Sequence, residues 1–135
     1  MNIINQVDYK ELLDTCKTIA VVGLSSNSLR PSYGVSAYLQ RVGYRIIPVN
    51  PVEKEILGEK CYASLKDIPE PVDIVDVFRN PDAVGPIADD AIAIGAKCLW
   101  LQEGVINTEA AEKAANSGLK VVMDHCILKI HRSLA

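Results

Sequence analysis

The chain has 135 residues, of which 49% are hydrophobic and 23% charged, and its formal net charge is -3. This is the length of one domain, which we take as residues 1–135, and the composition is that of a folded globular protein rather than a disordered one. An acidic chain without a basic run lacks the electrostatic footprint for nucleic acid, and no apolar run is long enough to span a membrane. We therefore expect neither nucleic acid nor a membrane as a partner.

The N-terminal stretch and the cysteines bear on the location of the protein. Residues 1–17 lack the basic and apolar regions of a secretory signal. Nothing else indicates export, and the cysteines lack the paired spacing of a zinc site. They are Cys16, Cys61, Cys98 and Cys126. We expect a cytoplasmic protein with reduced thiols and without a structural metal.

Apolar runs of strand length alternate along the chain with segments that carry helix signals. In chain order, we predict a helix at about 8–15, a strand at 18–24, a helix at 33–42, strands at 44–50 and 72–78, a helix at 81–94, a strand at 97–102, a helix at 109–117, a strand at 119–124 and a helix at about 126–134. Ser32 is the predicted N-cap of the second helix, Asn80 is the predicted N-cap of the third with a proline at its first helical position, and Asn107 or Thr108 begins the fourth.

The predicted strands are nearly continuous in apolar and β-branched residues, which is typical of strands that are covered on both faces. Strands that alternate with helices form right-handed βαβ units. The sequence therefore predicts an α/β fold, a Rossmann-like doubly wound parallel sheet of about five strands with helices on both faces. Ligands of such sheets bind outside the carboxyl ends of the strands, where the strand order reverses.

The loop after the first strand, "GLSSNSLRPS", has the chemistry of an anion site. Gly23 permits a tight turn, Arg30 can bind phosphate oxygens in a bidentate manner, and the start of the following helix offers free N–H groups. The candidate residues of this loop are Gly23, Leu24, Ser25, Ser26, Asn27, Arg30 and Ser32. A dinucleotide turn would carry two further glycines here. The alternative is an ordinary polar loop with a solvated arginine.

The ends of the second and third strands add four candidates. Asn50 and Pro51 follow the second strand, where a dinucleotide fold usually has a carboxylate for the ribose, and this absence argues against NAD. Asn50 can instead donate to a phosphate, or it can simply initiate a turn. Phe78 and Arg79 follow the third strand, where they can contact a base and a phosphate, or serve as a core aromatic beside a surface arginine.

The last two strand ends carry weaker signals. Gln102, Glu103 and Gly104 can border a pocket after the fourth strand, and Trp100 within that strand is interpreted as core. The fifth strand leads into "DHC", residues 124–126. Because adjacent side chains of an extended segment point to opposite faces, we do not expect these three to form a catalytic or metal centre.

The ordered series "VVGLSSNSLRPSYGV", "GYRIIPVNP", "ILGEKCYASLKDIP", "VDIVDVFRNP", "AIAIGAKCLWLQEGV" and "GLKVVMDHC" resembles the family of small CoA-binding proteins related to the CoA-binding domain of succinyl-CoA synthetase alpha subunits. The resemblance implies that coenzyme A binds with its phosphates at the first loop and its adenosine near the ends of strands two and three. Its implied site comprises Gly23, Ser25, Ser26, Asn27, Arg30, Ser32, Asn50, Pro51, Phe78 and Arg79. His125 stands where the family pattern leads us to expect arginine.

Three functions are compatible with these observations. The first is a binding, sensing or carrier module for CoA or an acyl-CoA that catalyses no reaction. The second is an enzyme, either NAD(P)-dependent or acting on CoA thioesters, although no nucleophile and base pair is evident. The third is an interaction protein whose pocket has no ligand.

Overall fold

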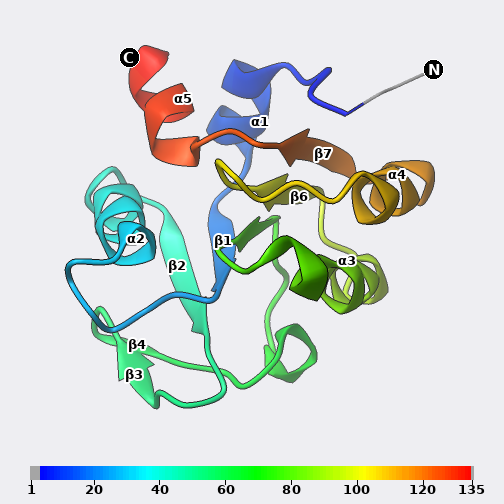
Figure 1. Cartoon of the computed structure of the whole chain (residues 1–135). Helices are drawn as coiled ribbons and strands as arrows, with labels where there is room; N and C mark the ends of the chain where they lie inside the picture. Colours follow the sequence, from blue (N-terminus) through cyan, green and yellow to red (C-terminus); the bar gives the residue numbers. More distant parts are fainter. Residues whose placement is uncertain (1–3, 135) are drawn as a thin grey trace.

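A five-stranded parallel sheet forms the centre of the computed structural model, which describes residues 4–134 (Figure 1). The strands are β1 (Thr18–Val22), β2 (Arg45–Val49), β5 (Ile74–Val77), β6 (Cys98–Leu101) and β7 (Lys120–Met123). Their order in the sheet is β2-β1-β5-β6-β7, and every neighbouring pair is parallel. The predicted Rossmann-like α/β fold is thus confirmed, and each strand lies within its predicted range.

Helices cover both faces of this sheet. They are α1 (Tyr9–Thr15), α2 (Pro31–Arg41), α3 (Val84–Ala93), α4 (Thr108–Asn116) and α5 (Ile127–Ser133), with short 3₁₀ turns at Leu65–Asp67 and Pro81–Ala83. Figure 1 shows α3 and α4 on one side of the sheet and α1, α2 and α5 on the other. Each helix overlaps the range predicted for it.

The sheet separates two apolar cores. On the α3 and α4 side, Ala20 and Val22 of β1 face helix alanines such as Ala88 and Ala111. The alternate β1 residues, Ile19 and Val21, face α1, α2 and α5. Successive side chains of a strand therefore enter the two cores in alternation. Since both cores are apolar, each strand is a continuous apolar run in the sequence. Trp100 is fully buried, as predicted, and its indole N–H donates to the carbonyl of His125 at 2.8 Å.

Of the N-caps predicted from the sequence, that of α4 is confirmed and those of α2 and α3 are wrong. Asn80 precedes only the 3₁₀ turn Pro81–Ala83, and α3 follows with Ala83 as its N-cap. The side chains of Asp8 and Asn107 accept hydrogen bonds at the starts of α1 and α4. The prediction that Ser32 is the N-cap of α2 is wrong, since Arg30 occupies that position and Pro31 is the first helical residue. Pro31 suits the first helical position because its fixed φ matches the helix. Ser32 therefore lies inside the first turn of α2, where its hydroxyl oxygen can accept a hydrogen bond from the preceding loop.

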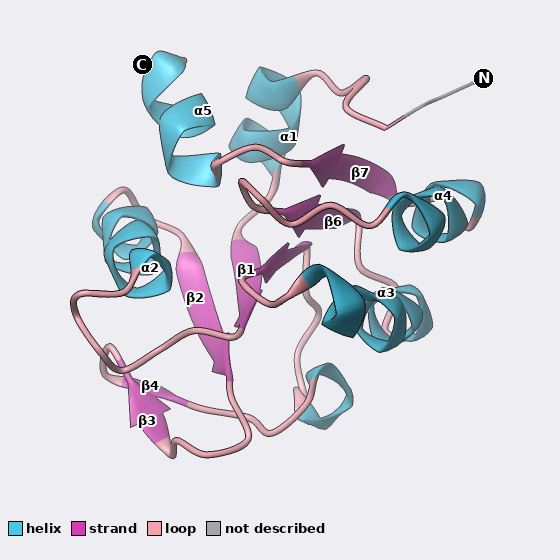
Figure 2. Cartoon of the chain, in the orientation of Figure 1, coloured by secondary structure: helices cyan, strands magenta, loops and turns pink. Residues whose placement is uncertain are grey.

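A small antiparallel hairpin, β3 (Glu55–Ile56) and β4 (Glu59–Lys60), was not predicted from the sequence (Figure 2). Leu57 and Gly58 connect its strands, with φ values of 56° and 75°. Positive φ at both central residues is the geometry of the tight hairpin turn that matches strand twist. The hairpin leads back to the edge of β2, where the N–H of Tyr62 donates to the carbonyl of Pro48 at 3.0 Å.

The strand order determines where a ligand site is expected. Counted among the sheet strands alone, the order is 2-1-3-4-5, and the chain reverses its direction of winding between β1 and β5. The carboxyl ends of these two strands lead to Gly23 and to Phe78. This is the switch point at which doubly wound sheets bind their ligands. Among the described helices, none is long and apolar enough to cross a membrane.

Candidate functional site

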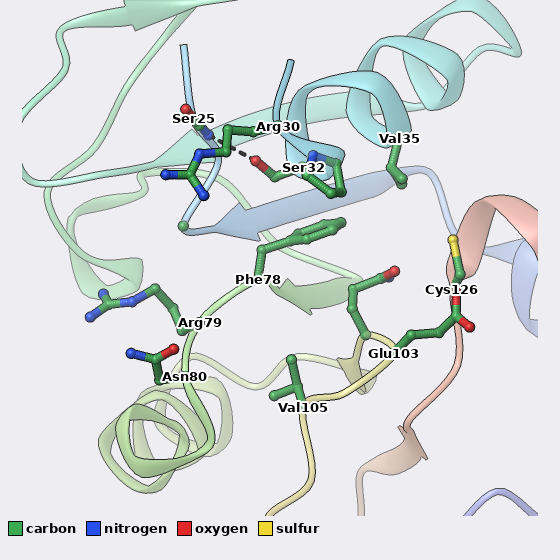
Figure 3. Close-up of a pocket in the computed structure, with 13 residues that line it drawn as sticks. Ser25, Arg30, Ser32, Val35, Phe78, Arg79, Asn80, Glu103, Val105 and Cys126 are labelled. Atoms are coloured by element: carbon green, nitrogen blue, oxygen red, sulfur yellow. Dashed lines mark hydrogen bonds between the residues drawn. The ribbon is translucent and has the colours of Figure 1, made fainter. Parts of the chain in front are cut away.

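A cavity of about 780 Å³ opens at this switch point (Figure 3). Six residues singled out from the sequence for ligand binding line it, namely Gly23, Ser25, Arg30, Ser32, Phe78 and Arg79. Others on its wall include Val35, Asn80, Gln102, Glu103, Val105 and Cys126. These residues come from helix α2 and from loops that are far apart in the sequence, and the parallel sheet brings them together because all its strands end on the same side.

Gly23 forms the tightest point of the site. Its φ is 87°, and its N–H donates to the carbonyl of Val49 at 3.0 Å. A Cβ atom at this position would collide with the carbonyl oxygen of Phe78 and would lie 2.8 Å from Cδ of Arg79. Glycine is therefore required for two reasons, the left-handed backbone and the close approach of the loop after β5.

The loop between Gly23 and α2 is held by its own polar side chains. The N–H of Ser25 donates to Oγ of Ser32 at 3.0 Å, and the N–H of Asn27 donates to Oγ of Ser25 at 3.0 Å. The side chain of Asn27 accepts from the N–H of Leu29 at 2.9 Å. The N–H groups of Ser26 and Ser32 have no acceptor within the described residues. The loop is thus ordered, and it leaves N–H groups free at the start of a helix, where an anion is favoured.

Two arginines give the cavity its cationic side. Arg30 and Arg79 are exposed, and neither guanidinium forms an ion pair or hydrogen bond with any residue of the described chain. Figure 3 shows both on the same side of the cavity as Ser25, whereas Cys126 and Val35 lie on the opposite side. Arg79 follows Phe78, whose ring is half-buried between the two sides. The cavity is therefore cationic at one end and largely apolar at the other.

The other five candidates from the sequence do not line the cavity. Leu24 is fully buried in the core beneath the loop. The hydroxyl of Ser26 donates to Glu53 at 2.9 Å, and Asn27 stabilises the loop as described above. Asn50 donates to the carbonyl of Leu24 at 3.0 Å and accepts from the N–H of Val52 at 2.8 Å, and exposed Pro51 follows it. These polar groups connect the ends of β1 and β2 to one another.

The apolar end of the cavity lies beyond β6 and β7. Glu103 is at this end, and its carboxylate pairs with Nζ of Lys129 at 2.8 Å, which raises the pKa of Lys129. Cys126 is half-buried and is the N-cap of α5. Asp124 adopts a φ of 65°, and its side chain accepts a hydrogen bond from the N–H of Gly104 at 2.8 Å. Asp124 and Gly104 therefore connect the loops that follow β7 and β6 beside the cavity.

Beneath the cavity, Asp76 and Gln102 form a buried polar pair that we did not predict from the sequence. Nε2 of Gln102 donates to Oδ1 of Asp76 at 2.6 Å. Burial raises the pKa of Asp76 to about 7, against the opposing effect of that hydrogen bond. A carboxylate within a strand that is otherwise apolar was the available signal, since such a residue must find a polar partner inside the protein.

The fold and the cavity define a class of protein, a parallel α/β domain with a cavity at its switch point that is lined by a glycine turn and two arginines. The sequence pattern of the CoA binding domain family matches residues 17–132 of this chain. The chain therefore belongs to the CoA binding domain family, as the resemblance of its motifs had indicated.

Known relatives agree with this assignment. The chain is 42% identical over 127 residues to the uncharacterized protein YneT of Bacillus subtilis, and the match covers 94% of each chain. It is similar in structure to a hypothetical protein from Pyrococcus horikoshii OT3, with a TM-score of 0.92, 40% identity and coverage of 94% and 89% of the two chains. It is 26% identical to an ADP-forming acetate–CoA ligase of Archaeoglobus fulgidus over 88% of this chain but only 19% of the ligase.

Proposed function

We propose that this protein binds coenzyme A or an acyl-CoA in the switch-point cavity, as a binding, sensing or carrier module. The observation that carries the proposal is that two guanidinium groups, those of Arg30 and Arg79, have no partner among the described residues. They lie beside the free N–H groups of the loop after β1. CoA carries a diphosphate and a further phosphate on its ribose. Charge-assisted hydrogen bonds from arginine are the strong contacts for such groups. Membership of the CoA binding domain family supports the same ligand.

The polarity of the cavity suggests how the ligand is oriented. The phosphates bind at the Arg30 and Arg79 side, and the pantetheine arm extends past Phe78 toward Val35 and Cys126. An uncharged arm suits this end because Val35 and Cys126 line it and because the Glu103 carboxylate there, which pairs with Lys129, would repel a phosphate. An acyl group on the thiol would be placed at the same end.

A nicotinamide dinucleotide is the second candidate ligand, and one observation favours it. Glu53 lies three residues beyond Asn50, and its carboxylate accepts from Ser26 at the first loop. A carboxylate beyond the second strand is what dinucleotide folds use to bind ribose hydroxyls. Against this candidate, Glu53 does not line the cavity, and the loop after Gly23 continues with Leu24, Ser25 and Ser26 in place of further glycines.

Calorimetric titration with CoA, dephospho-CoA, NAD and NADP distinguishes the two candidates. We expect CoA to bind most tightly, dephospho-CoA to bind more weakly because it lacks one phosphate, and NAD to bind weakest. Tighter binding of NAD than of CoA would refute the proposal and would assign the cavity to a dinucleotide. A native mass spectrum of the purified protein adds an independent readout, since a co-purifying CoA species or nicotinamide cofactor has a characteristic mass.

A further inference from the structure

Asp76 is a carboxyl group inside the central strand β5. It is fully buried, and in register it lies between Val21 of β1 and Trp100 of β6. Oδ1 contacts Gln102 at 2.6 Å, whereas Oδ2 is buried without a partner among the described residues. An ionised carboxylate has about four acceptor sites. A single hydrogen bond therefore leaves the charged form of Asp76 poorly stabilised, and protonation relieves this cost.

Gln102 connects this carboxyl group to the ligand cavity. The residue is buried, it lines the cavity, and its backbone is fixed by a 2.9 Å hydrogen bond from the N–H of Val105. Its amide nitrogen is bound to Asp76. Its amide oxygen has no hydrogen-bond partner within the described residues, and unlike Oδ2 of Asp76 it is not fully buried. The end of the amide that is not bound to Asp76 therefore faces the cavity.

The contact between the two side chains is compatible with two opposite hydrogen bonds. With Asp76 ionised, the Gln102 amide nitrogen donates to Oδ1, and the amide oxygen faces the cavity as an acceptor. With Asp76 protonated, its hydroxyl donates to the amide oxygen after a half-turn of the amide, and the NH₂ group faces the cavity as a donor. The separation of 2.6 Å between the two side chains accommodates either hydrogen bond.

We propose that Asp76 and Gln102 form a proton-linked pair that determines whether this point of the cavity offers the ligand a hydrogen-bond donor or an acceptor. Asp76 acts as a positioning residue, because it reaches the ligand only through Gln102. In its protonated form the pair presents a donor, which suits the phosphate and carbonyl oxygens of an acceptor-rich ligand. This part of the inference rests on the proposed function, whereas the proton-linked turn of the Gln102 amide does not.

The surroundings of Asp76 place its titration within the physiological range. Burial raises its pKa to about 7. The titratable side chains that pack into the core on this face of the sheet, or line the cavity above it, are Tyr9, Cys16, Arg30, Tyr33, Tyr38, Tyr44, Cys61, Arg79, Cys98, Glu103, Cys126 and, through its contact with Tyr38, His131. None of these forms a hydrogen bond or ion pair with Asp76 in the part of the chain that is described. Cys98 stays uncharged across this range, because burial together with Cys16 and Asp76 raises its pKa well above its usual value.

Side-chain amide NMR tests the pair without any ligand. The chain has only three glutamines, Gln6, Gln40 and Gln102, so selective ¹⁵N-glutamine labelling gives three assignable NH₂ groups. We expect the Gln102 signals to move between pH 5.5 and 8.5 with one midpoint, while those of Gln6 and Gln40 stay fixed. In Asp76→Asn, which has a similar shape but no titrating carboxyl group, we expect the Gln102 signals to be constant. A Gln102 amide that does not respond to pH in the parent protein would overturn the proposal, and this result needs no variant to fold.

Titration with CoA at pH 6.0 and pH 8.5 then tests the effect on the ligand. Binding of an anion further disfavours ionised Asp76, and a shift of one pKa unit is tenfold in affinity. We expect the parent to bind CoA about three- to tenfold more tightly at pH 6.0, beyond any change shown by Asp76→Asn, which removes the titration of Asp76 and keeps every other titrating group of the protein and of CoA. Identical pH profiles would refute the coupling to the ligand. If CoA does not bind at either pH, the proposed function fails, and the amide titration alone decides whether the pair exists.

Discussion

The arginines at the two ends of the parallel strands differ in whether they form ion pairs within the protein. We call these ends the amino edge and the carboxyl edge of the sheet. At the amino edge, the guanidinium of Arg45 contacts Glu70 at 2.5 and 2.8 Å and Glu59 at 3.4 Å, which raises the pKa of Arg45 and lowers that of Glu70. Asp73 accepts from the N–H groups of Lys17 and Thr18 at 2.8 and 3.1 Å. At the carboxyl edge, Arg30 and Arg79 have no such partner within the described residues.

This difference separates groups that stabilise the fold from groups that are available to a ligand. A paired charge has already exchanged its water for protein contacts, whereas an unpaired cation beside a cavity can still gain from an anion. We therefore expect substitutions at the carboxyl edge to change CoA binding, and substitutions at the amino edge to change stability alone. The predictions below test this contrast, from the largest expected effect to the smallest.

Gly23→Ala should have the largest effect, because it affects both binding and stability. A positive φ is unfavourable for alanine, and the added Cβ would displace Phe78 and Arg79. We expect the free energy of unfolding to fall by about 1–3 kcal/mol, as for other strained backbone positions, and CoA binding to be lost. Urea unfolding and calorimetry measure the two effects. Gly34→Ala is the matched control, since it lies in α2 with open space around it and should be neutral or stabilising. Equal behaviour of the two variants would contradict this account of Gly23.

Arg30→Ala should weaken CoA binding about ten- to a hundredfold, since a charge-assisted hydrogen bond contributes roughly 1.5–3 kcal/mol. Arg30→Lys should restore only part of this affinity, because the ammonium keeps the charge but loses the planar fork. The unfolding free energy should be nearly unchanged, as the side chain is exposed and unpaired.

Arg45→Ala is the control from the opposite edge. Its side chain is 49% exposed, and its ion pairs should contribute at most about 1 kcal/mol to stability. We expect CoA affinity to be unchanged in this variant. If Arg30→Ala bound CoA as tightly as the parent at moderate salt, the loop arginine would be solvated surface and the site assignment would fail.

Asp73→Asn should lower stability in a pH-dependent manner without altering CoA binding. Burial acts to raise the pKa of Asp73, but the N–H groups of Lys17 and Thr18 together with Lys97 lower it below its ordinary value of 3.8. A carboxyl group with a lowered folded pKa stabilises the protein above the unfolded value, and this contribution is lost as pH falls through the folded pKa. We expect the variant to be less stable by about 1–2 kcal/mol at pH 7, with a smaller difference near pH 3. Urea unfolding at both pH values measures it, and a difference that is the same at both would contradict the assigned role of the carboxylate.

The sheet and its main helices could be predicted from the sequence because they follow from local signals. Continuous apolar runs indicated five strands, and Asn107 indicated the start of α4. The β3–β4 hairpin could not, since its strands have two residues each and its turn begins with Leu57, which rarely adopts positive φ.

The site could be predicted only in part. Gly23, Arg30 and Phe78 were found because parallel strands end at one edge, and this geometry is fixed by the fold. Asn50 has the chemistry of a ligand contact, but its amide is occupied by backbone groups from Leu24 and Val52. The sequence alone does not show that the hydrogen bonds of this amide are already made, because its partners include a residue of a different loop. Asp76 carried a signal, as the one carboxylate in an otherwise apolar strand, but its partner Gln102 follows a different strand and could not be identified from the sequence.

Protection of Cys126 from alkylation by a bound CoA analogue tests most directly whether CoA occupies this cavity. Cys16, Cys61 and Cys98 are buried, whereas Cys126 is partly exposed on the cavity wall. Iodoacetamide should therefore label Cys126 first, and desulfo-CoA, which has no thiol of its own, should slow this labelling in proportion to its binding. Peptide mapping by mass spectrometry identifies the labelled residue. A labelling rate at Cys126 that saturating desulfo-CoA leaves unchanged would contradict the account, since the ligand would then bind elsewhere or not at all.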